Sequence, residues 1–220
     1  MIEVIIFDFD GVIAESVDIK TKAFAELFKK EGRAVESKIV EYHLANAGVS
    51  RYDKFRYIYK NILKRDLSDK EFNALCKRFA GLAMESVVVA PYVKGATAFL
   101  KDNAEIYDYF IVTATPQEEM DAILKKRGIA GFFIGVYGAP LKKADSVRSI
   151  VDREAVAPEK VVYVGDALSD YKAAKENNVN FIARVSQGVA VFSDIECVKI
   201  KDLSHLERAL GKMGLKESAK

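Results

Sequence analysis

Short apolar runs alternate with helical patterns along most of the chain. The apolar runs are rich in β-branched and aromatic residues and are continuous, which predicts strands that are buried on both faces. Helical spacing of apolar residues fills most of the segments between them. The predicted strands are residues 3–8, 107–113, 132–136, 161–165, 180–184 and 197–200, and the predicted helices are residues 96–103, 117–127, 145–154 and 169–177. This alternation predicts an α/β fold, a Rossmann-like parallel sheet with helices on both faces.

One region interrupts the alternation, because residues 15–87 contain no convincing strand. Four helical patterns follow one another there. The third has a possible N-cap at Ser50, with Asp53 three residues later, and a single apolar face from Phe55 to Leu63. We therefore expect a helical domain of residues 15–87, inserted into a discontinuous α/β core domain of residues 1–14 and 88–220.

Acidic residues stand at the ends of two predicted strands. Asp8 and Asp10 close the first strand, and Asp166 and Asp170 close the fourth. In a parallel sheet the carboxyl ends of the strands are where ligands usually bind. Gly11 allows a sharp turn that lets the backbone approach a ligand.

A hydroxyl group and a lysine are expected at the same edge. Thr113 closes the second strand, and Lys142 and Lys143 precede the helix that leads to the fourth. Four carboxylates so close together would repel one another, and a divalent cation with oxygen ligands removes that repulsion. Mg²⁺ suits a few carboxylates together with a phosphate, so we expect Mg²⁺ as the cofactor.

The amino-acid composition excludes several classes of protein. The chain has 220 residues, 50% of them apolar, and 34 Lys and Arg against 32 Asp and Glu give a formal net charge of +2. The high apolar fraction excludes intrinsic disorder. The small net charge gives the chain as a whole no electrostatic attraction for nucleic acid. Two cysteines make no disulfide framework, no apolar stretch is long enough to span a membrane, and the first residues lack the features of a secretory signal. We expect a cytoplasmic protein that binds neither nucleic acid nor membrane, as a monomer or homodimer.

With these features in this order, the chain resembles the haloacid dehalogenase-like hydrolase superfamily. The specific likeness is to phosphatases with a helical cap after the first strand, the group of phosphoglycolate phosphatase and β-phosphoglucomutase. The sequence DFDGV at 8–12 matches the first motif, IVTAT at 111–115 the second, Lys142 or Lys143 the third, and GDALSD at 165–170 the fourth.

The resemblance implies a role for each matched residue. Asp8 would be the nucleophile that forms an aspartyl-phosphate, and Asp10 the general acid and base. Thr113 and the motif lysine would hold the phosphoryl group, beside Gly11 and Ala114. The Mg²⁺ ligands would be Asp8, the backbone carbonyl of Asp10, and Asp166, with Asp170 either as a further ligand or as a residue that orients one.

The third motif does not decide which of the two lysines matches the family's lysine, because family members often carry a Lys-Pro-x-Pro sequence that is missing here. The stretch GAPLKK at 138–143 is similar to a variant of the motif that ends on its lysine. This similarity favours Lys143, and Lys142 remains the alternative.

The predicted cap carries a positive charge that has two interpretations. Residues 15–88 contain 15 Lys and Arg and 11 Asp and Glu, a net charge of +4. Most of these cations are expected to form a solvated helix face. The exception is Gly-Val-Ser-Arg at 48–51, which is similar to a substrate-binding loop of β-phosphoglucomutase-like caps. Arg51, and after it Lys54, are therefore the candidates for substrate selection.

Three functions follow from these observations. The first is a Mg²⁺-dependent phosphomonoester hydrolase that acts on a small phosphorylated metabolite through an aspartyl-phosphate. The second is a phosphosugar mutase, which the Gly-Val-Ser-Arg loop favours and Asp170 opposes. The third is a non-catalytic binding module, which the intact acidic motifs oppose.

Overall fold

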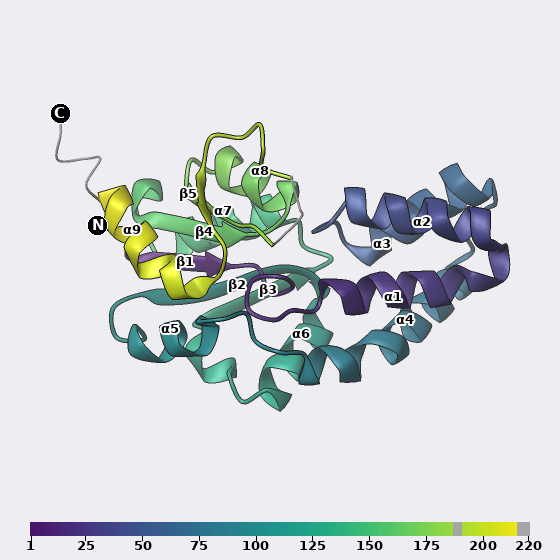
Figure 1. The fold of residues 1–220 in the computed structure, drawn as a ribbon, viewed down its shortest axis with the longest axis horizontal. Helices are drawn as coiled ribbons and strands as arrows, with labels where there is room; N and C mark the ends of the chain where they lie inside the picture. Colours follow the sequence, from purple (N-terminus) through teal and green to yellow (C-terminus); the bar gives the residue numbers. More distant parts are fainter. Residues whose placement is uncertain (187–190, 215–220) are drawn as a thin grey trace.

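The computed structural model describes residues 1–186 and 191–214 and contains a six-stranded sheet with helices on both faces (Figure 1). Neighbouring strands all run parallel, in the order β3-β2-β1-β4-β5-β6. The α/β, Rossmann-like fold predicted from the sequence is confirmed. The strands are β1 (Val4–Phe7), β2 (Asp108–Pro116), β3 (Gly135–Ala139), β4 (Val161–Gly165), β5 (Asn180–Arg184) and β6 (Val198–Ile200).

Strand β1 is buried on both faces because its side chains alternate between two helical layers. Ile5 and Phe7 belong to the core that α5, α6 and α9 cover, and Val4 and Ile6 belong to the core under α7 and α8. This position explains why the strand reads as a continuous apolar run. The helices are α5 (Ala96–Asp102), α6 (Gln117–Lys126) and α9 (Leu206–Gly214) on one face, and α7 (Lys143–Arg153) and α8 (Leu168–Glu176) on the other.

The third strand differs from its prediction. The apolar run predicted a strand over residues 132–136, whereas β3 is Gly135–Ala139. Phe132 ends a short 3₁₀ turn (Ala130–Phe132), and Phe133 follows it with 9% of its surface exposed. The two aromatic side chains thus pack on the core from a turn, and their hydrophobicity indicates burial without indicating a strand.

Between β1 and β2 lies a bundle of helices with a core of its own. The helices are α1 (Val17–Phe28), α2 (Arg33–Ala45), α3 (Arg51–Tyr57) and α4 (Asp69–Val89). Their inward side chains form a cluster separate from the two cores of the sheet, comprising Phe24, Ile39, Phe55, Ile58, Leu75 and Phe79 among others. The end of α4 departs from this separation, because Val87 packs in the sheet core and the helix continues to Val89.

The third helix of the bundle begins as predicted and then changes type. The Ser50 side chain accepts a hydrogen bond from the backbone N–H of Asp53, which caps α3. A π-helix, Ile58–Leu63, follows in place of a continuous α-helix and ends at Lys64, whose φ is 55°. The apolar pattern of residues 55–63 predicts the buried face, and it does not report the change in helix type.

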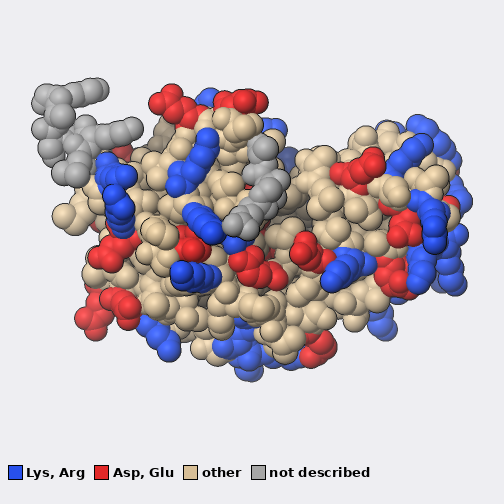
Figure 2. Space-filling model, in the orientation of Figure 1, with Lys and Arg blue, Asp and Glu red and all other residues tan. Residues whose placement is uncertain are grey.

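Charged groups of both signs are scattered over the visible surface, and basic side chains gather at the end of the bundle farthest from the sheet (Figure 2). Lys60 and Lys64 are exposed, as expected for a solvated helix face. Within residues 1–186 and 191–214, no helix has the length and apolar character needed to cross a membrane.

Arg127, directly after α6, joins that helix to the end of α4 in the helical bundle. Its Nη1 lies 2.9 Å from the carbonyl oxygens of Val87, Val88 and Ala90, at the carboxyl end of α4. Its guanidinium also lies 4.0 Å from the centroid of the Tyr92 ring. Carbonyls at a helix end have no partner within the helix, so a cation there provides both hydrogen bonds and a favourable charge.

We therefore expect Arg127→Met to lower the free energy of unfolding by roughly 2–3 kcal/mol, because hydrogen bonds from a charged donor to partly buried carbonyls are lost. The control is Lys126→Met. Lys126 also reaches α4, through an ion pair with Glu85, but that pair is exposed and contributes less than about 0.5 kcal/mol. Urea unfolding curves measure both variants, and equal losses would contradict the role given to Arg127.

Candidate active site

Three carboxylates meet at the carboxyl edge of the sheet. Asp8 directly follows β1 and Asp166 directly follows β4, and these strands are paired neighbours. Asp170 joins them from the first turn of α8. Each of the three offers an oxygen, and these oxygens lie within 4.8 Å of one another. The structure thus brings together three of the four acids that the sequence singles out.

Lys143 is the cation beside these acids. Its Nζ lies 2.6 Å from Oδ1 of Asp170 and 3.1 Å from Oδ2 of Asp8, and all three side chains are buried. Burial alone would lower the pKa of Lys143, but the charges of Asp170 and Asp8 outweigh it and raise the pKa, so the ammonium stays protonated. Lys142 is exposed at the N-cap of α7. Of the two candidate lysines, Lys143 is the one that the structure places in the site.

Asp170 is held by protein groups at both of its oxygens. Oδ1 lies beside Lys143 and 2.9 Å from the hydroxyl of Tyr163, while Oδ2 accepts a hydrogen bond from the N–H of Ala167 at 3.0 Å. This arrangement fixes the carboxylate, which in turn fixes Lys143. Tyr163 is a further site residue, and the sequence does not single it out because the strand predicted over residues 161–165 is buried throughout and nothing in its pattern marks the hydroxyl.

The ionised forms of Asp8 and Asp166 are unfavourable in this buried site. Burial raises the pKa of Asp8 to about 7, against the opposing charge of Lys143, and Asp170 adds to the rise. Burial also raises the pKa of Asp166 well above its ordinary value, with Asp8 and Asp170 contributing. A hard dication with oxygen ligands would relieve this repulsion, so the donor set fits Mg²⁺.

Gly11 is required by the close approach of Asp166. Its φ is +77°, and a Cβ at this position would lie 2.1 Å from Oδ2 of Asp166. Any side chain would therefore displace a carboxylate of the cluster. The sharp turn predicted after DFDG brings backbone and carboxylate together here.

The side chain of Asp10 has a different set of partners from the cluster. Its Oδ1 accepts a hydrogen bond from Ser16 at 2.6 Å, and its Oδ2 contacts Lys20 and accepts from Thr115 at 3.0 Å. Burial would raise the pKa of Asp10, but the charge of Lys20 and these hydrogen bonds hold it below its ordinary value. Sequence reasoning missed Ser16, Lys20 and Thr115. The four-residue spacing of Ser16 and Lys20, just after the first motif, was the available signal.

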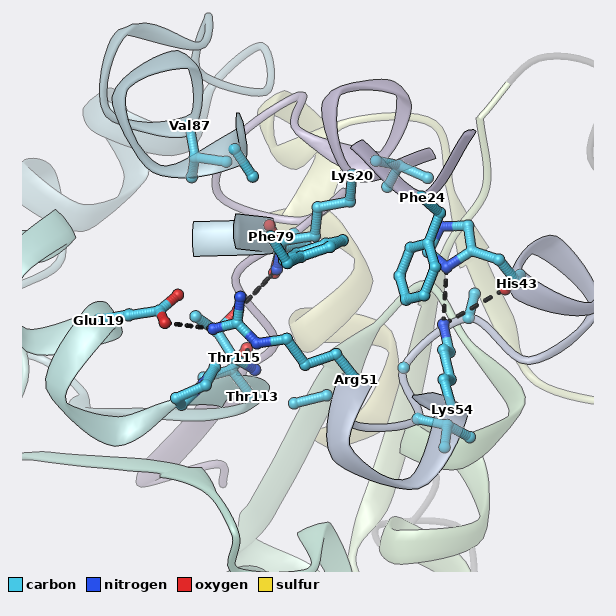
Figure 3. A pocket seen from close by; sticks show the side chains of 18 of the residues that line it. Lys20, Phe24, His43, Arg51, Lys54, Phe79, Val87, Thr113, Thr115 and Glu119 are labelled. Carbon is cyan, nitrogen blue, oxygen red and sulfur yellow. Dashed lines mark hydrogen bonds and ion pairs between the residues drawn. The ribbon is translucent and has the colours of Figure 1, made fainter. Parts of the chain in front are cut away.

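A cavity separates this edge of the sheet from the helical bundle (Figure 3). Asp8, Asp10, Thr113, Ala114 and Asp166 line it from the sheet side. Helices of the bundle supply an apolar wall on the other side, which includes Phe24, Phe79, Ala83, Met84 and Val87. Predicted residues from both parts of the chain, among them Asp8 and Asp166 on one side and Arg51 and Lys54 on the other, therefore line one cavity.

Arg51 lines this cavity and is paired with an acidic residue, Glu119. Its Nη2 forms an ion pair with Glu119 in the first turn of α6, and its guanidinium lies 4.8 Å from the centroid of the Phe79 ring. The side chain is buried, and its Nε has no hydrogen-bond partner among the described residues. Glu119 is thus a further residue of the site that the sequence did not indicate.

Lys54 lines the cavity at another point. Its Nζ lies 3.0 Å from Nδ1 of His43 and 3.3 Å from the carbonyl oxygen of the same residue. Burial, and then the charges of Lys54 and Lys20, lower the pKa of His43 to about 3, so the ring is neutral. His43 belongs to none of the sequence motifs described above, and the packing of α2 against α1 brings it here.

Known proteins share both the sequence features and the fold. Residues 5–184 match the family model of the haloacid dehalogenase-like hydrolases. A phosphoglycolate phosphatase of Pseudomonas putida is 24% identical over 190 residues, which are 81% of this chain and 67% of that protein. A phosphorylated carbohydrates phosphatase of Thermotoga maritima is 23% identical over 185 residues, 82% of this chain and 83% of that protein.

A solved structure agrees with the fold as a whole. The β-phosphoglucomutase of Clostridium difficile superposes with a TM-score of 0.78 at 17% identity, covering 99% of this chain and 100% of the other. The family match spans both β1 and the motif after β4, and thus includes all the acids of the site. The chain belongs to the haloacid dehalogenase-like hydrolases.

Proposed function

We propose that this hydrolase is a Mg²⁺-dependent phosphatase that removes phosphate from a small phosphorylated metabolite, with Asp8 as the nucleophile. The observation that carries the proposal is the buried contact of Asp8 with Lys143, with Asp8 lining a cavity between the edge of the sheet and the helical bundle. The names of the Pseudomonas putida and Thermotoga maritima relatives, both phosphatases, support the reaction class.

Asp8 is positioned for attack on phosphorus. Its Oδ1 accepts a hydrogen bond from the N–H of Phe9 at 2.8 Å, and its Oδ2 faces Lys143. In the proposed step a carboxylate oxygen forms a bond to phosphorus as the bond from phosphorus to the leaving oxygen breaks. The resulting aspartyl-phosphate divides one difficult displacement into two easier ones.

Positive and hydrogen-bonding groups surround the phosphoryl position. The Lys143 ammonium offsets the repulsion between the carboxylate of Asp8 and an incoming phosphate, and its charge stabilises the transition state. Thr113 and Ala114, at the cavity floor, are proposed to position the phosphoryl oxygens together with the backbone at Gly11.

Asp10 is proposed as the proton carrier. Its low pKa leaves it as a carboxylate, which is the state required to accept a proton from the water that hydrolyses the aspartyl-phosphate. The same carboxyl would then hold the proton needed by the leaving oxygen of the next substrate. Ser16, Lys20 and Thr115 fix its orientation.

Asp8, Asp166 and the backbone carbonyl of Asp10 are the proposed Mg²⁺ ligands, with Asp170 nearby. When bound, the ion supplies charge that neutralises the carboxylates and the phosphate. Because both oxygens of Asp170 already have protein partners, its proposed role is to orient Lys143.

Residues 15–87 are proposed as a cap whose movement admits the substrate. They carry the loop of Gly48, which is seated against the core: a Cβ there would lie 2.1 Å from Oγ of Ser169. The proposed core domain is residues 1–14 and 88–220, and the hinges are proposed near residues 14–15 and 85–88. Closure would exclude bulk water while the aspartyl-phosphate forms.

A phosphosugar mutase is the second candidate, favoured by the Gly-Val-Ser-Arg loop and by the fold shared with the Clostridium difficile enzyme. The pairing of Arg51 with Glu119 weighs against it, because that cation is not free to hold a second phosphate. Release of inorganic phosphate without a bisphosphate activator distinguishes the two functions.

The proposed function is tested by measuring phosphate release from a panel of sugar phosphates, phosphoglycolate, nucleotides and phosphoamino acids. We expect Mg²⁺-dependent release that a chelator abolishes and added Mg²⁺ restores. Asp8→Asn should lower kcat by at least about 10³-fold, because it removes the nucleophile. Activity that survives this substitution or the chelator contradicts the proposal.

The two adjacent lysines provide a matched test of the site. Lys143→Met should lower kcat by about 10²- to 10³-fold, because it removes the buried charge that faces Asp8. Lys142→Met, one residue earlier and exposed, should stay within about twofold of the unmodified protein. Steady-state kinetics on one active substrate measure both, and a larger effect at Lys142 would refute the assignment of Lys143.

A further inference from the structure

Three cations reach the cavity from the helical bundle, and they differ in their partners (Figure 3). Lys20 contacts Asp10, and Arg51 is paired with Glu119. Lys54 has no ion pair with an acidic group among residues 1–186 and 191–214. Two of the three charges are therefore balanced within the protein, and the third is not.

Lys54 is also deeply buried, with 3% of its surface exposed. Its contacts are the ring nitrogen and carbonyl oxygen of His43 and the face of Phe24, whose centroid lies 5.6 Å from Nζ. The neutral ring of His43 supplies no opposite charge. A buried ammonium without a counter-ion is unfavourable, and a bound anion would offset that cost.

Neighbouring cations make the charge of Lys54 more unfavourable in the absence of an anion. Burial first, and then the charges of Lys20 and Lys143, lower the pKa of Lys54 to about 7, against the opposing charge of Asp10. Lys54 is thus one of several ammonium groups around the same space. The loop that precedes it lies over the reacting group, since a Cβ at Gly48 would be 3.4 Å from Nζ of Lys143.

We propose that Lys54 binds a carboxylate of the substrate, and that the substrates of this hydrolase are accordingly phosphorylated carboxylic acids. The inference rests on the proposed phosphatase function and names its substrate class. One unbalanced positive charge matches the single charge of a carboxylate. A second phosphate would carry more negative charge than Lys54 alone balances, and Glu119 already neutralises Arg51. Lys54, rather than Arg51, is then the residue that determines specificity.

Two pairs of substrates test this contact. Within each pair, one compound has a carboxylate where the other has a hydroxymethyl group, and the rest of the molecule is the same. The pairs are phosphoglycolate with hydroxyethyl phosphate, and 3-phosphoglycerate with glycerol 3-phosphate. We expect the carboxylate member of at least one pair to have the higher kcat/KM. Lys54→Met should lower kcat/KM for that member by about 10- to 100-fold and for its partner by less than about threefold.

Lys60→Met is the matched control, because Lys60 is an exposed cation six residues further along the same helical segment. It should leave both members of each pair unchanged. The bisphosphate of ethylene glycol is the third arm of the experiment. Tighter use of this compound than of phosphoglycolate, if abolished by Lys54→Met, would assign Lys54 to a second phosphate and overturn the carboxylate proposal.

A binding measurement separates this inference from the catalytic proposal. In the Asp8→Asn background, calorimetry should give a Kd for the preferred acid that Lys54→Met raises by about 10- to 100-fold, with little change for its hydroxymethyl partner. Binding of this kind without turnover by the unmodified protein would contradict the phosphatase function and leave the carboxylate contact standing. Turnover of both members with equal kcat/KM, or equal effects of Lys54→Met on both, would overturn the contact alone.

Discussion

The arrangement of the site depends on one buried contact, the ammonium of Lys143 between Asp8 and Asp170. Parallel strands deliver Asp8 and Asp166 to the same edge, where burial makes their charges costly. A single lysine cannot neutralise three acids, so the cluster retains the capacity for a dication. Tyr163 and the N–H of Ala167 hold Asp170 in place, and this fixes the lysine in turn. Gly11 also preserves this arrangement, because a side chain there would collide with Asp166.

The helical bundle supplies the opposite electrostatic character. Its cations Lys20, Arg51 and Lys54 face the acids across one cavity, and two of them are already paired with acids of the sheet side, Asp10 and Glu119. Those pairs hold the two parts of the chain together without a ligand. The remaining cation, Lys54, is unpaired with any acid among the described residues, and a bound anion would stabilise it. One set of contacts thus links the position of the bundle to the selection of substrate.

Much of this could be predicted from sequence, because strand ends and glycines have local signatures. Asp8 and Asp166 follow from strand order, and the helical bundle follows from the lack of strands between residues 15 and 87. The motif lysine is narrowed only to Lys142 or Lys143, because adjacent lysines differ in burial and not in local pattern. Contacts between distant segments could not be predicted in this way. Glu119 looks like an ordinary first-turn acid, and His43 like a residue of an isolated helix, until tertiary packing brings them to the cavity. The strand expected at residues 132–136 failed for a related reason, since Phe132 and Phe133 pack on the core from a turn.

The most direct test of the account is detection of phosphate on Asp8 itself. A substrate active in steady state is mixed with the protein and Mg²⁺, quenched in acid within one turnover, and digested for mass spectrometry. If Asp8 is the nucleophile, a peptide containing Asp8 carries one additional phosphoryl group, located on Asp8 by fragmentation and missing in Asp8→Asn. A phosphoryl group on any other residue, or hydrolysis that proceeds with none on Asp8, would contradict it.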